Sequence, residues 1–210
     1  MINPIHHPAE AVLQSYRQGS LAHPFAVVVA THLSLCDECR SASEAADMVG
    51  GIVLERSAGC SLSAGLRAGT MAALDRPPPP PQIAASGIFP APVMHELGGL
   101  PPQWRMLGSG VRQQILSADD EGSLRLLYIP AGKAVPEHGH RGLELTLVLQ
   151  GSFHDSIGRF ARGDVESAQS DLDHQPIADP GEACICLAAT DAPLRFREVL
   201  PRLLQPLFRI

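Results

Sequence analysis

The sequence predicts two domains, a small all-α helical bundle followed by an all-β barrel. Five consecutive prolines at 77–81 form a stiff spacer without a packing role of its own. Apolar residues before this spacer recur at helical spacing, whereas the apolar runs after it are short and separated by Gly, Pro and Asp. We therefore expect a helical domain at 1–76, a Pro-rich linker at 77–93 and a β domain at 94–210.

Four helices are expected before the spacer. The first spans 8–20, and the second, 23–39, is apolar almost all round, which is typical of a buried helix. The third spans 37–55 and is expected to end or kink at Gly50-Gly51, because glycine is a poor helix former. The fourth spans 61–76, where a serine could cap its start.

Four strands are expected after the spacer. Short runs rich in β-branched, aromatic and aliphatic residues occupy 123–132, 143–153, 183–190 and 193–200. Turn-forming residues lie between them, as in an all-β sandwich or barrel.

The composition excludes several classes of protein. The net charge is −6, Lys133 is the only lysine, and the arginines are scattered, so no basic footprint for direct nucleic-acid binding is present. No run approaches the roughly 20 apolar residues of a membrane-spanning helix, and the N-terminus lacks the pattern of a secretory signal. We expect a cytoplasmic protein with a protein partner. The five cysteines are then first considered as metal or redox groups.

An H-x3-C-x2-C pattern is formed by His32, Cys36 and Cys39. On a continuous helix these residues lie near one face. Zinc takes four nitrogen or sulfur ligands in a tetrahedron, so a fourth ligand is needed, and His6 or His7 could supply it if the first segment folds back.

Two other interpretations of this pattern are a redox dithiol and chance placement. A thioredoxin-like C-x-x-C opens a helix after a strand, and no strand is expected before Cys36. We therefore favour a closed, structural zinc site, which would stabilise a domain too small to rely on its core alone.

A second group of metal-ligating residues lies in the β domain. His138 and His140 are two apart, so they share one face of a strand. Glu144 keeps the same parity after a bend expected at Gly142, and His174 is the best candidate for a fourth ligand. Three imidazoles and a carboxylate suit zinc, manganese, iron or nickel. The alternative is a set of polar residues on a solvated strand face.

The fourth expected helix carries an apolar stripe. Its members are Leu62, Leu66, Met71 and Leu74. Such a stripe can lie in a groove of a partner or pack onto its own domain, and the sequence leaves both possibilities open.

The spacing of the second group resembles the first cupin motif. The matching residues are Gly132, His138, His140, Glu144 and Gly151. With H-x3-C-x2-C before it and the run "CICLAATDAPLRF" after it, the whole order resembles the ChrR-type anti-sigma factors. The resemblance implies a zinc-binding anti-sigma helical domain that binds an extracytoplasmic-function sigma factor, and a cupin-like sensor domain. It also implies release of the sigma factor under photooxidative stress, singlet oxygen in particular.

The resemblance assigns ligands to both metal sites. We expect zinc in the N-terminal site and a second divalent metal, for which zinc is the expected ion, in the cupin-like domain. The ligands implied for the first site are His7, His32, Cys36 and Cys39, and those for the second are His138, His140, Glu144 and His174.

Two other functional classes fit the sequence less well. A metal-dependent cupin dioxygenase or isomerase would need a general acid or base and an open metal position, and no convincing additional pair is present. A DNA-binding regulator would need a basic recognition helix, which is lacking. Cys184 and Cys186 share one face of a strand, either as core residues or, less favoured, as oxidisable sensor thiols.

Overall fold

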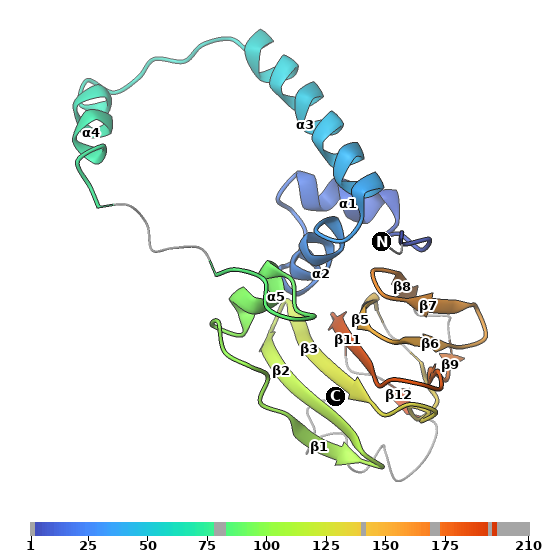
Figure 1. Ribbon diagram of the computed structural model, residues 1–210. Coiled ribbons are helices and arrows are strands. Elements are labelled where there is room, and N and C mark those ends of the chain that lie inside the picture. The colour runs from blue at the N-terminus through green and yellow to red at the C-terminus, as the bar shows by residue number, and fades with distance from the viewer. Residues whose placement is uncertain (1–2, 78–82, 140–141, 169–172, 193–194, 197–210) are drawn as a thin grey trace.

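The structure is a computed structural model, and it describes residues 3–77, 83–139, 142–168, 173–192 and 195–196 (Figure 1). Helices occupy the N-terminal part and strands the C-terminal part, as predicted. The helices are α1 (Glu10–Arg17), α2 (His23–Leu33), α3 (Asp37–Arg56), α4 (Leu66–Ala73) and α5 (Ala91–Glu96).

α1 and α4 are shorter than the predicted spans 8–20 and 61–76, and α4 has Gly65 in place of a serine as its N-cap. Three further differences concern the other helices. The predicted second helix ends early, at Leu33, and the chain turns before α3 begins. α3 runs without interruption through Gly50-Gly51; a side chain there would meet nothing, so no close packing or turn demands these glycines. α5 begins inside the segment 77–93 that was expected to be spacer, because Val93 and Met94 are apolar and become buried.

The strands are all paired antiparallel. They are β1 (Arg105–Gly108), β2 (Val111–Asp119), β3 (Gly122–Ile129), β4 (His138–Gly139), β5 (Glu144–Gln150), β6 (Ser152–His154), β7 (Arg159–Ala161), β8 (Val165–Ala168), β9 (Asp173–His174), β10 (Ile177–Ala178), β11 (Cys184–Thr190) and β12 (Arg195–Phe196). The runs predicted at 123–132, 143–153 and 183–190 are confirmed as β3, β5 with β6, and β11. The run predicted at 193–200 lies mostly outside the described residues.

The predicted closed barrel is not formed by the described strands. They make a six-stranded sheet in the order β1-β2-β3-β11-β5-β8 and two three-stranded sheets, β10-β6-β7 and β12-β4-β9. The edge strands β1 and β8 lie at opposite ends of the large sheet and pair with no common neighbour, so this sheet stays open. The strands of the two small sheets have only two or three residues each, and they form separate sheets that do not extend the hydrogen-bond ladder of the large sheet.

Both faces of the large sheet are buried. The central strand β5 shows this, because its successive side chains alternate between the two faces and nearly all of them are buried. Leu145, Leu147 and Leu149 point to one face, and Glu144 and Thr146 point to the other. The leucine face belongs to a large apolar cluster that also contains residues of α2 and α5. The opposite face packs against Phe153 and Phe160 of the small β10-β6-β7 sheet and carries the polar groups described below.

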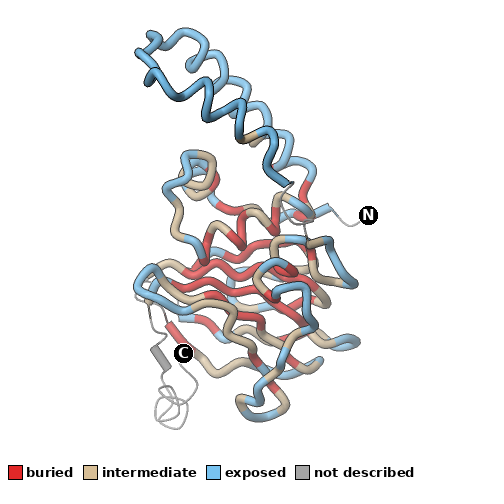
Figure 2. Tube along the Cα trace, turned by 90° about the vertical axis from the view of Figure 1, so that its left-hand side faces the viewer, coloured by how far each residue is buried: buried red, intermediate tan, exposed pale blue. Residues whose placement is uncertain are grey.

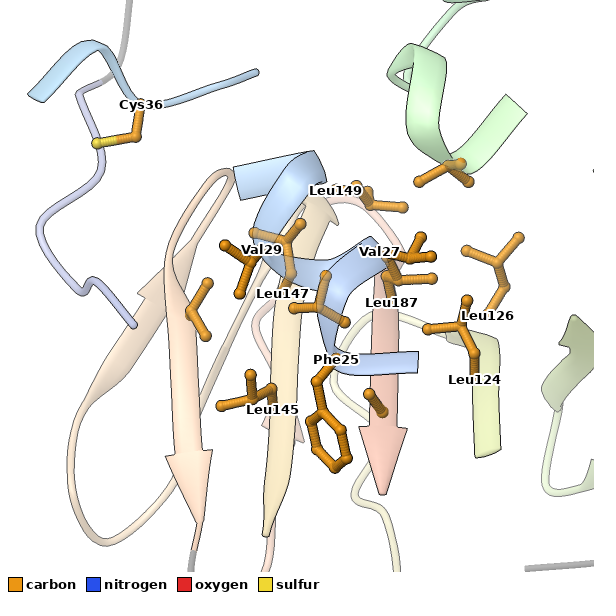
Figure 3. Packing of buried hydrophobic residues seen from close by; sticks show 14 of the residues in the cluster. Phe25, Val27, Val29, Cys36, Leu124, Leu126, Leu145, Leu147, Leu149 and Leu187 are labelled. Atoms are coloured by element: carbon orange, nitrogen blue, oxygen red, sulfur yellow. The ribbon is translucent and has the colours of Figure 1, made fainter. Parts of the chain in front are cut away.

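Helix α2 lies directly on the leucine face (Figure 3). Phe25, Val27 and Val29 point toward the leucines of the central strands, and Val28 and Val29 have no exposed surface. Full burial of each such side chain stabilises the fold by about 1.5–3 kcal/mol. One apolar core therefore joins the N-terminal helices to the β domain across the proline-rich segment.

The far half of α3 and all of α4 extend away from this core (Figure 1), and Figure 2 shows them exposed along their length. α4 buries no residue. Within the described part of the chain, no helix combines the length and the apolar character that crossing a membrane requires.

Candidate metal centres

The first cluster of ligand-type side chains joins three separate pieces of chain. His7 lies on the segment before α1, His32 in the last turn of α2, and Cys36 and Cys39 at the start of α3. One ligand atom from each of the four lies within 4.8 Å of every other. His7 Nδ1 is 3.3 Å from Cys39 Sγ and 3.5 Å from Cys36 Sγ. His6 instead faces Phe160 and Asp164.

The expected single helix through these ligands is not present. α2 ends after His32, and Cys36 takes an extended conformation as the N-cap of α3, with φ −116° and ψ 108°. The amide groups of Leu35 and Cys36 both donate to the His32 carbonyl, at 2.8 Å each. A tight turn therefore brings His32 and Cys36 together, where a shared helix face had been expected.

The spacing of the cluster fits a tetrahedral ion. With bonds of about 2.3 Å to sulfur and about 2.0 Å to nitrogen, ligand atoms around zinc lie about 3.3–3.8 Å apart. The His7–cysteine distances fall in this range. His32 Nδ1 lies 2.8 Å from the Gly163 carbonyl and donates to it, which leaves Nε2 with its lone pair toward the cluster. Nε2 is buried and has no hydrogen-bond partner, as expected for a metal-ligating atom.

The electrostatics of this cluster oppose a reactive dithiol. Burial, with the neighbouring Cys36, raises the pKa of the Cys39 thiol to about 12. Burial also lowers the pKa of His32, which keeps its imidazole neutral. Redox-active cysteines need a lowered thiol pKa, whereas a bound cation supplies the charge that stabilises thiolates.

The segment carrying His7 is held by the turn between β7 and β8. The buried Asp164 carboxylate accepts hydrogen bonds from the backbone amides of Ile5, His6 and Ala161. Burial alone would raise the pKa of Asp164, but these donors lower it, so the carboxylate is ionised. The sequence analysis missed Asp164, because its partners are 158 and 159 residues away in the chain.

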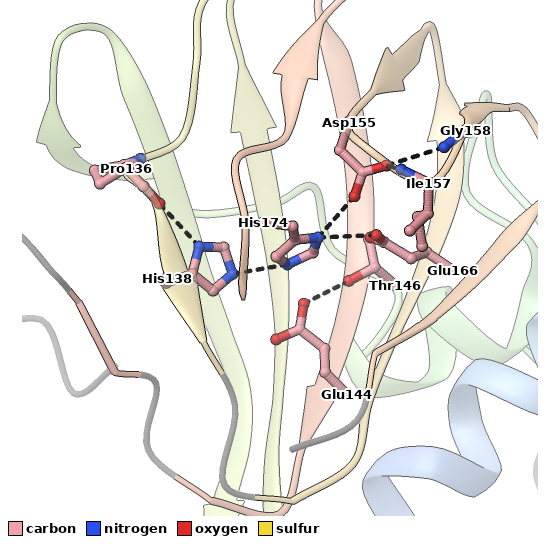
Figure 4. Close-up of polar contacts among 9 residues, drawn as sticks. All are labelled: Pro136, His138, Glu144, Thr146, Asp155, Ile157, Gly158, Glu166 and His174. Carbon is pink, nitrogen blue, oxygen red and sulfur yellow. Dashed lines mark hydrogen bonds and ion pairs between the residues drawn. The ribbon is translucent and has the colours of Figure 1, made fainter. Parts of the chain in front are cut away.

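The second cluster lies on the polar face of the large sheet (Figure 4). His138 of β4 is paired with His174 of β9, and Glu144 begins β5 nearby. All three are buried, and their ligand atoms lie within 4.8 Å of one another. His140 falls outside the described residues.

The two imidazoles of this cluster face one another. His138 Nδ1 donates to the Pro136 carbonyl at 2.8 Å, so its Nε2 carries a lone pair. His174 Nε2 lies 3.2 Å from that atom. Two imidazole ligands bonded at about 2.0–2.1 Å to one ion lie about 3.0–3.4 Å apart, so the pair fits a shared cation. Without an ion, a proton on His174 Nε2 fills the same gap.

Two carboxylates contact Nδ1 of His174, and the sequence analysis did not identify them. Its Nδ1 lies 2.8 Å from Asp155 Oδ2 and 2.9 Å from Glu166 Oε1 (Figure 4). Burial alone would lower the pKa of His174, but the hydrogen bond and the charge of Glu166 raise it to about 9. Burial raises the pKa of Glu166 to about 7. The pair fixes the tautomer of His174 that directs Nε2 toward the other ligands.

The buried cysteines of β11 pack as core residues. Cys184 and Cys186 lie in the same apolar cluster as Phe153 and Phe160, with their sulfur atoms 3.4 Å apart. Their mutual hydrogen bond and burial raise the pKa of Cys186 well above its usual value. This placement agrees with the favoured interpretation of the C-x-C pattern.

The predicted apolar stripe is exposed on the projecting helices. Its four side chains range from 47% to 73% exposed, with Leu66 and Met71 inside α4 and Leu62 and Leu74 flanking it. The far half of α3 adds exposed apolar side chains: Met48, Val49, Ile52, Val53 and Leu54. We call these nine residues the apolar face. Exposed apolar side chains gathered on projecting helices make these segments candidates for an interaction site.

Known proteins match this chain along its length. Residues 101–193 match the family described as ChrR Cupin-like domain. Over 209 residues the chain is 54% identical to the anti-sigma-E factor ChrR of Cereibacter sphaeroides, and 98% of each chain is covered. The crystal structure of Rhodobacter sphaeroides SigE in complex with the anti-sigma ChrR matches with a TM-score of 0.78 at 51% identity, covering 89% of this chain and 98% of that chain. The similarity thus includes both the helical part and the β domain.

Proposed function

This chain belongs to the ChrR-type anti-sigma factors, and from that premise we propose that it sequesters an extracytoplasmic-function sigma factor. Bound in this way, the sigma factor cannot reach RNA polymerase, so the chain represses transcription from sigma-dependent promoters. As a member of this family it is a regulatory protein and not an enzyme. The cupin dioxygenase or isomerase considered from the sequence is therefore set aside.

The apolar face carries this proposal. No side chain of α4 is buried, so packing against the rest of the described chain does not hold this helix in place. Nine exposed apolar side chains are costly to leave in water, so we expect a partner to cover them. The matched crystal structure contains a sigma factor bound to a relative of this chain, which identifies the class of partner. The apolar face would then be the contact surface, with Leu62, Leu66, Met71 and Leu74 inserted in a groove of the sigma factor.

Zinc is the ion that best suits His7, His32, Cys36 and Cys39, because two thiolates and two imidazoles form a closed tetrahedral donor set. The ion would neutralise the thiolates and tie the N-terminal segment to α2 and α3. The four residues orient the start of α3, and α3 carries one part of the apolar face.

The β domain is proposed to be a cupin-like sensor with a second divalent metal. His138, Glu144 and His174, with His140, would be the ligands, and zinc is the expected ion. Photooxidative stress, singlet oxygen in particular, would be the signal that releases the sigma factor. We place this function in the cytoplasm, where the sigma factor acts, and keep 1–76, 77–93 and 94–210 as the working division into anti-sigma domain, linker and sensor.

Binding of the second metal is expected to release about one proton per ion at pH 7. Below a pKa of about 9 the imidazole of His174 is protonated in the metal-free protein, and only its neutral form can bind an ion. Affinity should therefore rise close to tenfold per pH unit between about pH 7 and 8 and level off as pH passes the His174 pKa of about 9, while Glu166, with a pKa of about 7, becomes ionised.

Calorimetry in two buffers with different heats of ionisation measures this proton release. The protein should carry Cys36→Ser, so that only the second site binds the ion. His154→Gln, at a half-exposed histidine outside the cluster, is the control and should behave like its parent. An affinity independent of pH, with no proton released, would contradict the prediction.

Met71→Asp is expected to weaken sigma-factor binding about 30-fold or more, because a charge would replace an apolar anchor worth about 2 kcal/mol or more. Met106→Asp is the matched control, since both methionines are 58% exposed but Met106 lies on β1 in the β domain. Affinities are measured by fluorescence anisotropy with a labelled sigma factor. Equal losses in the two variants would show that the apolar face is not the contact surface.

The full chain tests the function directly. Added to RNA polymerase and a candidate extracytoplasmic-function sigma factor, the zinc-loaded protein should silence transcription from a sigma-dependent promoter. Met71→Asp protein should require a much higher concentration for the same effect. If the full chain silences no candidate sigma factor, the proposed function is wrong.

A further inference from the structure

The turn between β7 and β8, residues 162–164, reaches across to the N-terminal metal cluster. Its Asp164 side chain is 3% exposed. Asp164 Oδ1 accepts from the amides of Ile5 at 2.7 Å and His6 at 3.0 Å. The amide of Val165 donates to the His6 carbonyl at 3.0 Å. Three hydrogen bonds thus hold the chain immediately before His7.

The same turn contacts a second ligand of the cluster. The Gly163 carbonyl accepts from His32 Nδ1 at 2.8 Å, which orients the ring. Gly163 has φ +92°, and a side chain there would come within 2.6 Å of Pro4. Glycine is required at this position because it permits both the left-handed backbone and the close approach of Pro4.

The turn also lies next to the second cluster. Glu166 follows Asp164 by two residues and begins β8 together with Val165. It is hydrogen-bonded to His174, the central residue of that cluster. One short stretch of backbone therefore contacts ligands or ligand-bearing segments of both candidate metal sites.

We propose that Asp164 is a positioning residue for the N-terminal metal site, and that the β domain controls metal retention there through the β7–β8 turn. The carboxylate fixes the segment that presents His7, and the adjacent carbonyl fixes His32, so two of four ligands are oriented from the β domain. A change at the second cluster that moves β8 would loosen both. The proposal rests on the proposed function in taking the ion to be zinc and the β domain to be the sensor.

Metal release from the full chain tests this proposal without any sigma factor. The protein is loaded with Co²⁺, and EDTA is added while the thiolate–cobalt absorption is followed. The same measurement on Cys36→Ser protein identifies the signal that belongs to the N-terminal site. A chain that bound no sigma factor would still give a valid result, so failure of the proposed function is detected separately.

The variants remove the contact from either side. Asp164→Ala removes all the carboxylate bonds, and Asp164→Asn keeps one acceptor oxygen. Ile5→Pro removes one amide donor and leaves the β domain unchanged; Ile5→Ala is its control, because this side chain is 74% exposed and its amide is retained. Asp179→Asn is the control in the β domain, where the carboxylate binds Ser152 and Arg159.

Metal release should accelerate about tenfold in Asp164→Ala and Ile5→Pro, as for loss of a group that orients a metal ligand, with Asp164→Asn intermediate. The two controls should match the parent. The double variant Asp164→Ala with Ile5→Pro should be much less than additive, since both changes remove one contact. Release at the parental rate in Ile5→Pro and in folded Asp164→Ala would overturn the proposal, and so would fully additive effects. If Asp164→Ala does not fold, Ile5→Pro decides alone.

Discussion

Cys36→Ser is expected to abolish metal retention in the N-terminal site and to lower sigma-factor affinity more than 100-fold. Serine is a poor ligand for zinc, and zinc binding contributes about 10–16 kcal/mol to the folding of small structural zinc sites at pH 7. Cys36 is also the N-cap of α3, and its sulfur accepts the amide of Cys39. Loss of the ion should therefore free the start of α3 and misplace the apolar face.

Cys60→Ser is the matched control, because Cys60 is exposed and lies outside the cluster. Metal content is measured by elemental analysis, and affinity by anisotropy with the sigma factor. We expect Cys60→Ser protein to keep the parental metal content and affinity. Parental affinity in metal-free Cys36→Ser protein would show that the ion does not organise the contact surface.

Val28→Asp is expected to destabilise the whole chain by at least about 3–5 kcal/mol, because it leaves a charge buried without a partner. Val28 has no exposed surface and lies in the apolar cluster shared by α2 and the large sheet. The loss should therefore appear in the unfolding of the β domain as well as of the helices. Urea unfolding followed by far-UV circular dichroism and by the fluorescence of Trp104, which lies just before β1, measures both parts.

Val49→Asp provides the comparison, since Val49 is also a helical valine but is 62% exposed. Its unfolding free energy should change by less than about 0.5 kcal/mol. If Val28→Asp lowered the stability of the helices and left the unfolding of Trp104 unchanged, the two parts would not share a cooperative core.

Much of the candidate site was predictable because its residues carry strong local patterns. His32, Cys36 and Cys39 lie within eight residues, and few other structures need that combination of ligand types. His7 required a guess about how the chain returns, and the structure brings it to the cysteines. Glu144 begins β5, inside the predicted run 143–153, whereas β4 with His138 lies outside the four predicted runs.

The residues that were missed support ligands on other elements of the fold. Asp155 and Glu166 support His174 from 19 and 8 residues away, and Asp164 contacts Ile5 in the His7 segment from 159 residues away. Each is an acidic residue in a turn or short strand, where a solvated carboxylate is the ordinary expectation. Only the burial of these side chains, together with their partners, distinguishes them.

What the sequence by itself determined is the order of helices and strands, two groups of candidate metal ligands, and the apolar stripe on and beside α4. Each of these depends on neighbours within about one turn or one strand, where spacing decides which side chains meet. The tertiary structure alone decided that α2 packs on the large sheet and that this sheet stays open. It also decided that Asp164 of the β domain holds the segment before His7 and that the Gly163 carbonyl orients His32. These features depend on which surfaces are buried together, and that is a property of the folded chain as a whole.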